Sequence, residues 1–225
     1  MSQASVSIIA FDHLDRAMES IGINLMRANV HQPGSPQRSF YLDVSIASTH
    51  ECAASLDVCL ARRVVEVETH AVVLMSLWRI RGMLLGMKRV KTHCVREDRA
   101  AYGSPAFPFA NLDMYRVSLE GVGWIHAFPE ELSPKARVRR KLDISATGTV
   151  LNIAEGHGRM TPVDQNRFMK TAEEHAFQTI LMLDLLVARQ EVNASRVEVG
   201  KAIKARVISM LHAWCAKNGG ELESS

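Results

Sequence analysis

The sequence predicts an all-α protein, with an up-down antiparallel four-helix bundle in its C-terminal half and a related three-helix unit in its N-terminal half. Apolar residues recur three, four or seven positions apart along most of the 225 residues, a spacing typical of helices that bury one face. Clusters of proline, glycine and serine interrupt this periodicity and mark turns. A conspicuous segment that begins at Asn152 also has a partial copy about 128 residues earlier, which indicates a tandem duplication.

The turns divide the chain into seven predicted helices. The third helix could also be two helices that meet near Gly82–Gly86. The approximate ranges are 6–28, 36–63, 65–90, 112–127, 134–155, 162–189 and 194–217.

Several helix ends carry recognisable capping residues. Ser35 and Thr161 are expected N-caps, because each has a side-chain oxygen and precedes a proline that suits the first helical turn. Asn111 is the expected cap of the fourth helix. Gly156 and Gly158 are expected to end the fifth helix, with Gly156 in the left-handed conformation.

A shift of 127 or 128 positions aligns the two halves of the chain. It pairs Asp15 with Asp143, Asn24 with Asn152, Leu56–Asp57 with Leu183–Asp184, and Ala61–Arg62 with Ala188–Arg189. We therefore expect a degenerate three-helix repeat unit over 1–92, a linker over 93–110, a four-helix bundle over 111–220 and a disordered tail over 221–225. The first unit lacks a counterpart of the first bundle helix, so its apolar groove should be covered by the other unit or by another protomer.

The composition indicates a globular protein, with 47% apolar and 23% charged residues. The four cysteines form no paired CxxC spacing, which argues against a disulfide framework. The N-terminus has no signal-peptide pattern, and Arg79 and Arg81 interrupt the longest apolar segment. We therefore expect a cytoplasmic protein without a membrane span.

Positive charge is concentrated in the middle of the chain. The formal net charge is only +3, but residues 79–141 hold thirteen Lys or Arg against six Asp or Glu. The predicted contact surface for nucleic-acid phosphates consists of Arg137, Arg139, Arg140 and Lys141, extended by Arg159, Arg167 and Lys170. A simple solvated helix start is the alternative. A second and weaker basic set consists of Arg79, Arg81, Lys88, Arg89 and Lys91, on a helix that also carries packing residues.

The segment from Asn152 to Arg159 forms a predicted structural corner between two helices. Glu155 could accept hydrogen bonds from amides at the start of the next helix, and Asn152 could bond across the bundle. Gly156 and Gly158 would permit the turn. An open ligand or subunit contact is the alternative, and a phosphate cradle is less well supported because no strand precedes the glycines.

The sequence contains no pattern typical of catalysis or metal binding. Its nine histidines form no His-x3-His pair and no HExxH motif, and no Glu-x-x-His motif recurs on two helices. No nucleophile elbow or Cys-His signature is present. We therefore expect no catalytic residue, no metal and no cofactor.

Three motifs in the second half together resemble a known family. They are Leu112-Asp113-Met114-Tyr115, the run Asn-Ile-Ala-Glu-Gly-His-Gly-Arg over 152–159, and Arg167-Phe168. On these motifs the segment 112–217 resembles the four-helix-bundle family of ribosomal RNA intervening-sequence (ribosomal-protein-like) proteins. That family includes the accessory protein of diversity-generating retroelements. The N-terminal copy departs from the pattern, since Asn24-Leu25-Met26-Arg27-Ala28 occupies the place of 152–156.

The resemblance implies an up-down bundle that often assembles as a ring-like homo-oligomer in bacteria. It also implies binding to nucleic acid beside a reverse transcriptase. We therefore expect a non-enzymatic adaptor that binds structured RNA, or a nucleic-acid-processing protein such as a reverse transcriptase. A purely structural protein-protein assembly module that binds no nucleic acid is the alternative.

Overall fold

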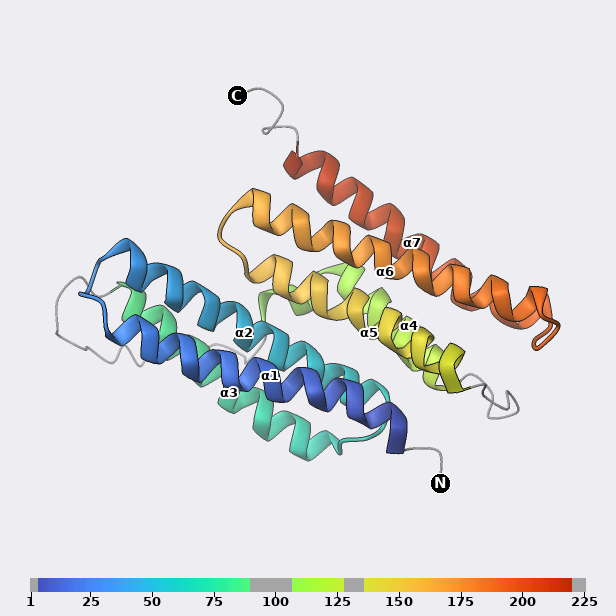
Figure 1. Cartoon of the computed structure of the whole chain (residues 1–225), viewed down its shortest axis with the longest axis horizontal. Helices are drawn as coiled ribbons and strands as arrows, with labels where there is room; N and C mark the ends of the chain where they lie inside the picture. Colours follow the sequence, from blue (N-terminus) through green and yellow to red (C-terminus); the bar gives the residue numbers. More distant parts are fainter. Residues whose placement is uncertain (1–3, 90–106, 128–135, 220–225) are drawn as a thin grey trace.

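The computed structural model describes residues 4–89, 107–127 and 136–219 of the chain (Figure 1). These residues are almost entirely helical and include no strand, so the prediction of an all-α protein is confirmed. The elements are α1 (Ala4–Asn29), α2 (Pro36–Ala61), α3 (Val67–Arg89), the 3-10 helix η2 (Pro108–Asn111), α4 (Asp113–Ala127), α5 (Ala136–Gly158), α6 (Pro162–Ala188) and α7 (Ala194–Gly219). None of the helices in the described ranges is apolar over a long enough stretch to cross a bilayer.

Two of the predicted caps form as expected. The side-chain oxygen of Ser35 accepts a hydrogen bond from the backbone N–H of Arg38 at 3.2 Å. Thr161 accepts an equivalent bond from Asp164 at 3.1 Å. Each bond satisfies one of the free N–H groups of the first turn, and the proline after each cap has no N–H to satisfy. These two residues therefore set the start of α2 and α6.

Two local predictions are wrong. Helix α5 continues through Gly156 and ends only at Gly158. Asn111 belongs to η2 instead of capping α4, and its carbonyl oxygen accepts a hydrogen bond from Arg116 at 2.7 Å. Helix α3 is continuous through Gly82, so the prediction of a single third helix is confirmed over its described length.

The end of the predicted linker is part of the core. Phe107 and Phe109 are buried, and their rings lie 5.5 Å apart. The rest of the linker, over 93–106, lies outside the described residues, as do the first two residues of the predicted fifth helix and the tail. The packing of the two phenylalanines explains why η2 lies against α4 and α5.

The helices of the two halves pack differently. In the second half, α4 and α6 each pack against both α5 and α7, so the four helices form a closed ring of neighbours. In the first half, α2 lies between α1 and α3 and packs on both. Helix α2 also packs against α5 and α4, and Figure 1 shows α2 and α5 side by side where the halves meet. Part of the apolar surface of the first half is therefore covered within the chain.

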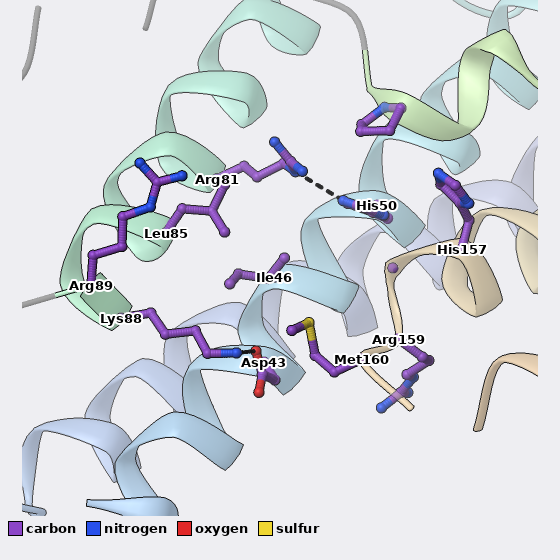
Figure 2. Close-up of a pocket in the computed structure, with 12 residues that line it drawn as sticks. Asp43, Ile46, His50, Arg81, Leu85, Lys88, Arg89, His157, Arg159 and Met160 are labelled. Carbon is purple, nitrogen blue, oxygen red and sulfur yellow. Dashed lines mark hydrogen bonds and ion pairs between the residues drawn. The ribbon is translucent and has the colours of Figure 1, made fainter. Parts of the chain in front are cut away.

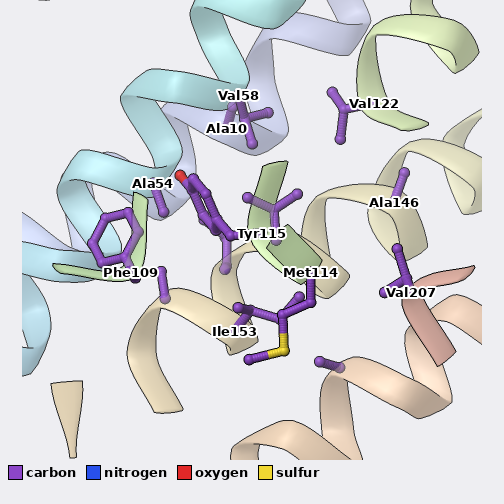
Figure 3. Close-up of a cluster of buried hydrophobic side chains, with 14 of the residues drawn as sticks. Ala10, Ala54, Val58, Phe109, Met114, Tyr115, Val122, Ala146, Ile153 and Val207 are labelled. Carbon is purple, nitrogen blue, oxygen red and sulfur yellow. The ribbon is translucent and has the colours of Figure 1, made fainter. Parts of the chain in front are cut away.

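One hydrophobic core spans both halves (Figure 3). Ala54 and Val58 of α2 meet Tyr115 of α4 and Ile153 of α5 in this cluster. The buried hydroxyl of Tyr115 donates a hydrogen bond to Asp57 at 2.8 Å, so its polar atom remains satisfied. The shared core predicts that the two halves unfold together.

A buried ion pair also joins the two halves. The guanidinium of Arg62, at the end of α2, lies 3.4 Å from the carboxylate of Asp143 on α5. It also donates hydrogen bonds to the hydroxyl of Thr147 at 2.9 Å and to the carbonyl oxygen of Asp143 at 3.3 Å. Arg62 is 2% exposed, so the charge needs these partners to be tolerated in the interior.

Helices α2 and α6 end in the same way. Arg63 and Gln190, 127 positions apart, adopt left-handed conformations with φ of 54° and 58°. Each donates its N–H to a carbonyl three residues back, at 2.9 Å. The next N–H, of Val64 or Glu191, reaches the carbonyl five residues back at 3.0 Å. This pair of backbone hydrogen bonds is a Schellman motif. It forms at equivalent positions at the ends of α2 and α6, in both cases without glycine.

Candidate functional site

The residues of the predicted phosphate-contact surface fall into two separate groups. Arg140 and Lys141 are exposed near the start of α5, Arg139 is partly buried, and the side chain of Arg137 lies outside the described part. Arg159, Arg167 and Lys170 lie at the opposite end of α5 and on α6. A helix rises 1.5 Å per residue, so roughly 27 Å separate Lys141 from Arg159. The two groups therefore do not form one compact patch.

The second group gathers around an aromatic ring. The guanidinium carbons of Arg159 and Arg167 lie 4.6 Å and 5.1 Å from the ring centroid of Phe168. Arg159 also pairs with Glu155, one helical turn earlier on α5. Lys170 and Arg167 are exposed on α6. Cation–π contact and the ion pair hold Arg159 in place at the corner between α5 and α6.

The two glycines of the corner motif allow close helix packing. A Cβ on Gly156 would lie 2.9 Å from the Cβ of Phe168, and a Cβ on Gly158 would lie 2.6 Å from the Nδ1 of His50. Both distances are too short for a real side chain. In the described residues Gly34 is the glycine with a positive φ, so the expected left-handed conformation of Gly156 is wrong. Glycine is needed there because α6 and α2 approach closely.

The polar residues of the motif bond within their own segment. The side-chain amide of Asn152 donates to the carbonyl oxygen of Gly148 at 2.8 Å, so the expected bond across the bundle is wrong. Asn24 makes the equivalent bond to Ser20 at 2.8 Å in the first half. Glu155 pairs with Arg159 instead of the amides of the next helix. Burial raises the pKa of Glu155, and the charge of Arg159 opposes that shift.

A pocket of about 450 Å³ opens beside this corner (Figure 2). We call it the corner pocket. Its walls come from α2, α3 and the α5–α6 corner, with Pro108 of η2 at one side. The lining residues are Asp43, Ile46, His50, Arg81, Leu85, Lys88, Arg89, Pro108, His157, Gly158, Arg159 and Met160. Four cationic side chains and one carboxylate therefore face a single space.

Arg81 is the most distinctive cation of the corner pocket. Its Nε donates a hydrogen bond to the Nε2 of His50 at 3.0 Å, as Figure 2 shows. Within the described ranges no carboxylate lies within 4.0 Å of this guanidinium. Burial lowers the pKa of Arg81, yet an arginine stays charged at any physiological pH. A half-buried positive charge with a neutral partner favours an anion as its further ligand.

The two histidines of the corner pocket are neutral at physiological pH. Burial, helped by the charge of Arg81 and by that of His157 when His157 is protonated, lowers the pKa of His50 to about 3. Burial and Arg81 also lower the pKa of His157. A neutral His50 can accept the bond from Arg81 only at an unprotonated Nε2, so its proton is on Nδ1. His50 therefore orients Arg81 without cancelling its charge.

The other cations differ in how strongly they are held. Lys88 pairs with Asp43 at 2.5 Å, which places its ammonium group at the rim. Arg89 is exposed at the end of α3, and Arg159 forms an ion pair with Glu155. Of the remaining second basic set, Arg79 is exposed outside the pocket lining and Lys91 lies outside the described residues. The structure thus brings three members of that set together with Arg159.

The corner pocket combines a cationic rim with an apolar wall. No lining residue is a cysteine, serine or threonine nucleophile. Over 4–89, 107–127 and 136–219, no three His, Cys, Asp or Glu side chains gather as a metal site. Ile46, Leu85, Pro108 and Met160 add apolar surface to the cationic rim. Such a pocket fits a ligand with one anionic end and one apolar face.

Arg159 belongs to the predicted phosphate-contact surface, whereas the basic residues of α3 form the set predicted to be weaker. Arg81, Leu85 and Lys88 are spaced four and three apart, so they share one helical face, and this was the available signal. No family model, curated protein or solved structure matches the chain.

Proposed function

We propose that this protein is a non-enzymatic helical adaptor that binds nucleic acid, with structured RNA as the favoured ligand. The observation that carries the proposal is the convergence of Arg81, Lys88, Arg89 and Arg159 from distant parts of the chain on one pocket. Phosphate groups are the anions that nucleic acids present at regular spacing. Arginine donates several hydrogen bonds in a fixed plane and matches phosphate oxygens well.

The two basic groups at the ends of α5 support an extended ligand. A chain of phosphates that reaches the corner pocket can also pass Arg140 and Lys141, roughly 27 Å away. Contacts of this kind position a backbone without reading its bases. They favour recognition of a folded shape over recognition of a sequence, which is typical of binding to structured RNA.

The proposed architecture is a tandem duplication within the family of ribosomal RNA intervening-sequence proteins. The ring of contacts among α4, α5, α6 and α7 supports an up-down four-helix bundle. The paired Schellman motifs at Arg63 and Gln190 support a common origin for the two halves. On this proposal a reverse transcriptase is the expected protein partner of the adaptor.

The proposal is tested by titrating a fluorescent RNA hairpin with the protein at several salt concentrations. We expect binding at low salt that weakens as salt rises, with a slope of about one per phosphate contact in a log–log plot. The double variant Arg81→Gln/Arg159→Gln should weaken binding at least about tenfold and reduce the slope by about two. Arg206→Gln removes an exposed cation of α7 outside the pocket and should change little. No binding at low salt would overturn the proposal.

A protein-assembly function is the second candidate, because α3 exposes an apolar stripe. Val72, Met75 and Met83 are 67%, 48% and 61% exposed, and their spacing places them on one face with Arg79. A second copy of the chain is the proposed partner of this face. Sedimentation of the wild type should then show a dimer or larger oligomer, and Met75→Glu/Met83→Glu should convert it to a monomer. A monomeric wild type at micromolar concentration would refute this candidate.

A further inference from the structure

We infer that the corner pocket encloses one unpaired nucleotide of the bound RNA, with its base on the apolar wall and its phosphate at the cationic rim. This inference rests on the proposed function, and it names the part of the nucleic acid that the pocket recognises. The pocket combines two surfaces, and a bare phosphate would use only one of them.

The size of the corner pocket fits a single nucleotide. Its volume of about 450 Å³ lies inside the range of about 300–1,000 Å³ that is typical of pockets enclosing one small ligand. A groove for a double helix would have to be far longer and more open. A base that is paired and stacked in a duplex also cannot enter a pocket without leaving its stack. The size therefore favours an unpaired nucleotide.

The apolar wall gives a base something to lie against. Ile46 is 5% exposed and forms part of the α2 side, while Leu85 extends from α3 toward the same space (Figure 2). Met160 enters from the α5–α6 corner and is 63% exposed, so its thioether is accessible to a ligand. Every base has an apolar face that packs on such groups, whichever base it is. Methionine and leucine contacts therefore predict a nucleotide without a strong base preference.

The rim presents unused hydrogen-bond donors. Arg81 uses its Nε on His50, and no described residue accepts a hydrogen bond from its two Nη groups. Figure 2 shows this guanidinium directed from α3 toward His50 at the pocket wall. Lys88 lies seven residues further along α3, about 10 Å along the helix axis, and Asp43 holds its ammonium group at 2.5 Å. Arg81 therefore offers a preorganised seat for the phosphate of the enclosed nucleotide, and Lys88 can contact the phosphate of a neighbouring nucleotide.

The first experiment compares two RNAs of equal length and charge by fluorescence anisotropy. One is a hairpin with an unpaired loop, and the other is a fully paired blunt duplex. We expect the hairpin to bind about tenfold more tightly, the effect expected of one stacked base. Unlabelled adenosine monophosphate should displace the hairpin at lower concentration than either adenosine or inorganic phosphate, because only the nucleotide carries both parts of the ligand.

Two variants separate the apolar wall from the rim. Met160→Ala removes an exposed side chain at the pocket and should reduce the preference for the hairpin, with an unchanged salt slope. Arg81→Gln should weaken the binding of both RNAs and lower the salt slope by about one. Arg206→Gln on α7 is the matched control that should alter neither measurement. Circular dichroism of each variant shows whether the helices remain folded.

The outcomes distinguish the nucleotide inference from the proposed function. Equal binding of hairpin and duplex, with no effect of Met160→Ala, would overturn the nucleotide inference and leave RNA binding intact. Displacement by inorganic phosphate as effective as that by the nucleotide would do the same, and would make the corner pocket a simple phosphate site. If neither RNA bound at low salt, both the inference and the proposed function would fail.

Discussion

The imidazole of His50 lies directly against the backbone of Gly158, where a Cβ would come within 2.6 Å of its Nδ1. This contact brings the end of α5 onto α2 and closes one wall of the corner pocket. His50 is fixed on its other sides by Phe107 and Phe109, each with its ring centroid 5.4 Å away. The pocket wall and the core are therefore built from the same histidine.

Gly158→Ala should destabilise the protein. The added methyl group meets a ring that is 98% buried in a packed core, so the free energy of unfolding should fall by about 1–3 kcal/mol. Gly82→Ala is the matched control, since no atom lies within 4 Å of the Cβ position on exposed α3. There the substitution should stabilise by about 0.5–1 kcal/mol. Chemical denaturation of both variants measures the difference, and equal effects would contradict the packing role of Gly158.

Stability should fall in acid because His50 is buried without charge. Its pKa is about 3 in the folded protein, against 6.5 for the ordinary side chain. Between these values the unfolded chain binds one more proton here, so this contribution to stability is complete above pH 6.5 and is lost as pH falls toward 3. Near pH 5 the loss is about 1.4 kcal/mol per pH unit.

The variant His50→Asn isolates this contribution. Asparagine can still accept the bond from Arg81 but does not titrate, so its unfolding free energy should fall less steeply between pH 6 and 4. Other histidines with lowered pKa, such as His157, contribute equally to both proteins and cancel in the comparison. Parallel curves for wild type and variant would show that His50 takes up a proton while folded.

Lys204→Met should stabilise the protein near neutral pH. Lys204 is 1% exposed on α7, and its Nζ has no hydrogen-bond partner among the described residues. Burial lowers the pKa of this amine to about 7, against 10.5 for the ordinary side chain. The unfolded chain therefore binds the extra proton between pH 7 and 10.5, and the cost of burial is complete below pH 7.

Methionine is an unbranched side chain one atom shorter than lysine, and it lacks the amine. We expect the free energy of unfolding to rise by about 2–4 kcal/mol at pH 6.5, with a smaller gain at pH 9, where the wild-type penalty has partly disappeared. Denaturant unfolding at both pH values provides the measurement. A variant that is less stable than the wild type at pH 6.5 would indicate that Lys204 has an important polar role in the core.

Removing one partner of the buried Arg62–Asp143 ion pair should lower the free energy of unfolding substantially. Asp143→Ala leaves the guanidinium of Arg62 buried without its carboxylate, so the free energy of unfolding should fall by about 3 kcal/mol or more. The exposed pair of Arg116 and Asp113 is the control, and Asp113→Ala should cost less than about 1 kcal/mol.

The double variant Arg62→Met/Asp143→Leu tests the origin of this cost. Both charges are removed, so no uncompensated charge remains and most of the stability should return. Thermal unfolding of the wild type, both single variants and the double variant completes a double-mutant cycle. A double variant as unstable as Asp143→Ala would mean that the pair stabilises the junction of the halves by its own attraction.

Most of the helices could be predicted from local sequence because helix formation and helix capping depend on residues close together in the chain. Periodic apolar residues fix the helices, and capping at Ser35 and Thr161 involves residues only three positions apart. The prediction was wrong where a residue serves a distant contact. Gly156 and Gly158 have the spacing typical of a helix end, but the packing of α6 and α2 is what requires them.

The candidate site was less predictable for the same reason. Arg159 stood out because it ends a recognisable motif, whereas Arg81 lies on a helix with packing residues on both sides. Nothing local indicates that α3 faces the α5–α6 corner across a pocket, since His50 of α2 contacts both Arg81 of α3 and Gly158 of α5. The predicted extension of the Arg140 group to Arg159 would have to run the length of α5, because the two residues lie at its opposite ends.

The corner pocket takes its walls from both halves of the chain. A solitary ancestral unit could supply α2 and α3, or the α5–α6 corner, but not both within one molecule. Under the duplication proposed above, the pocket is younger than the helices that line it. On the proposed function, ligand recognition then arose with that duplication, at a seam that the single ancestral unit did not have.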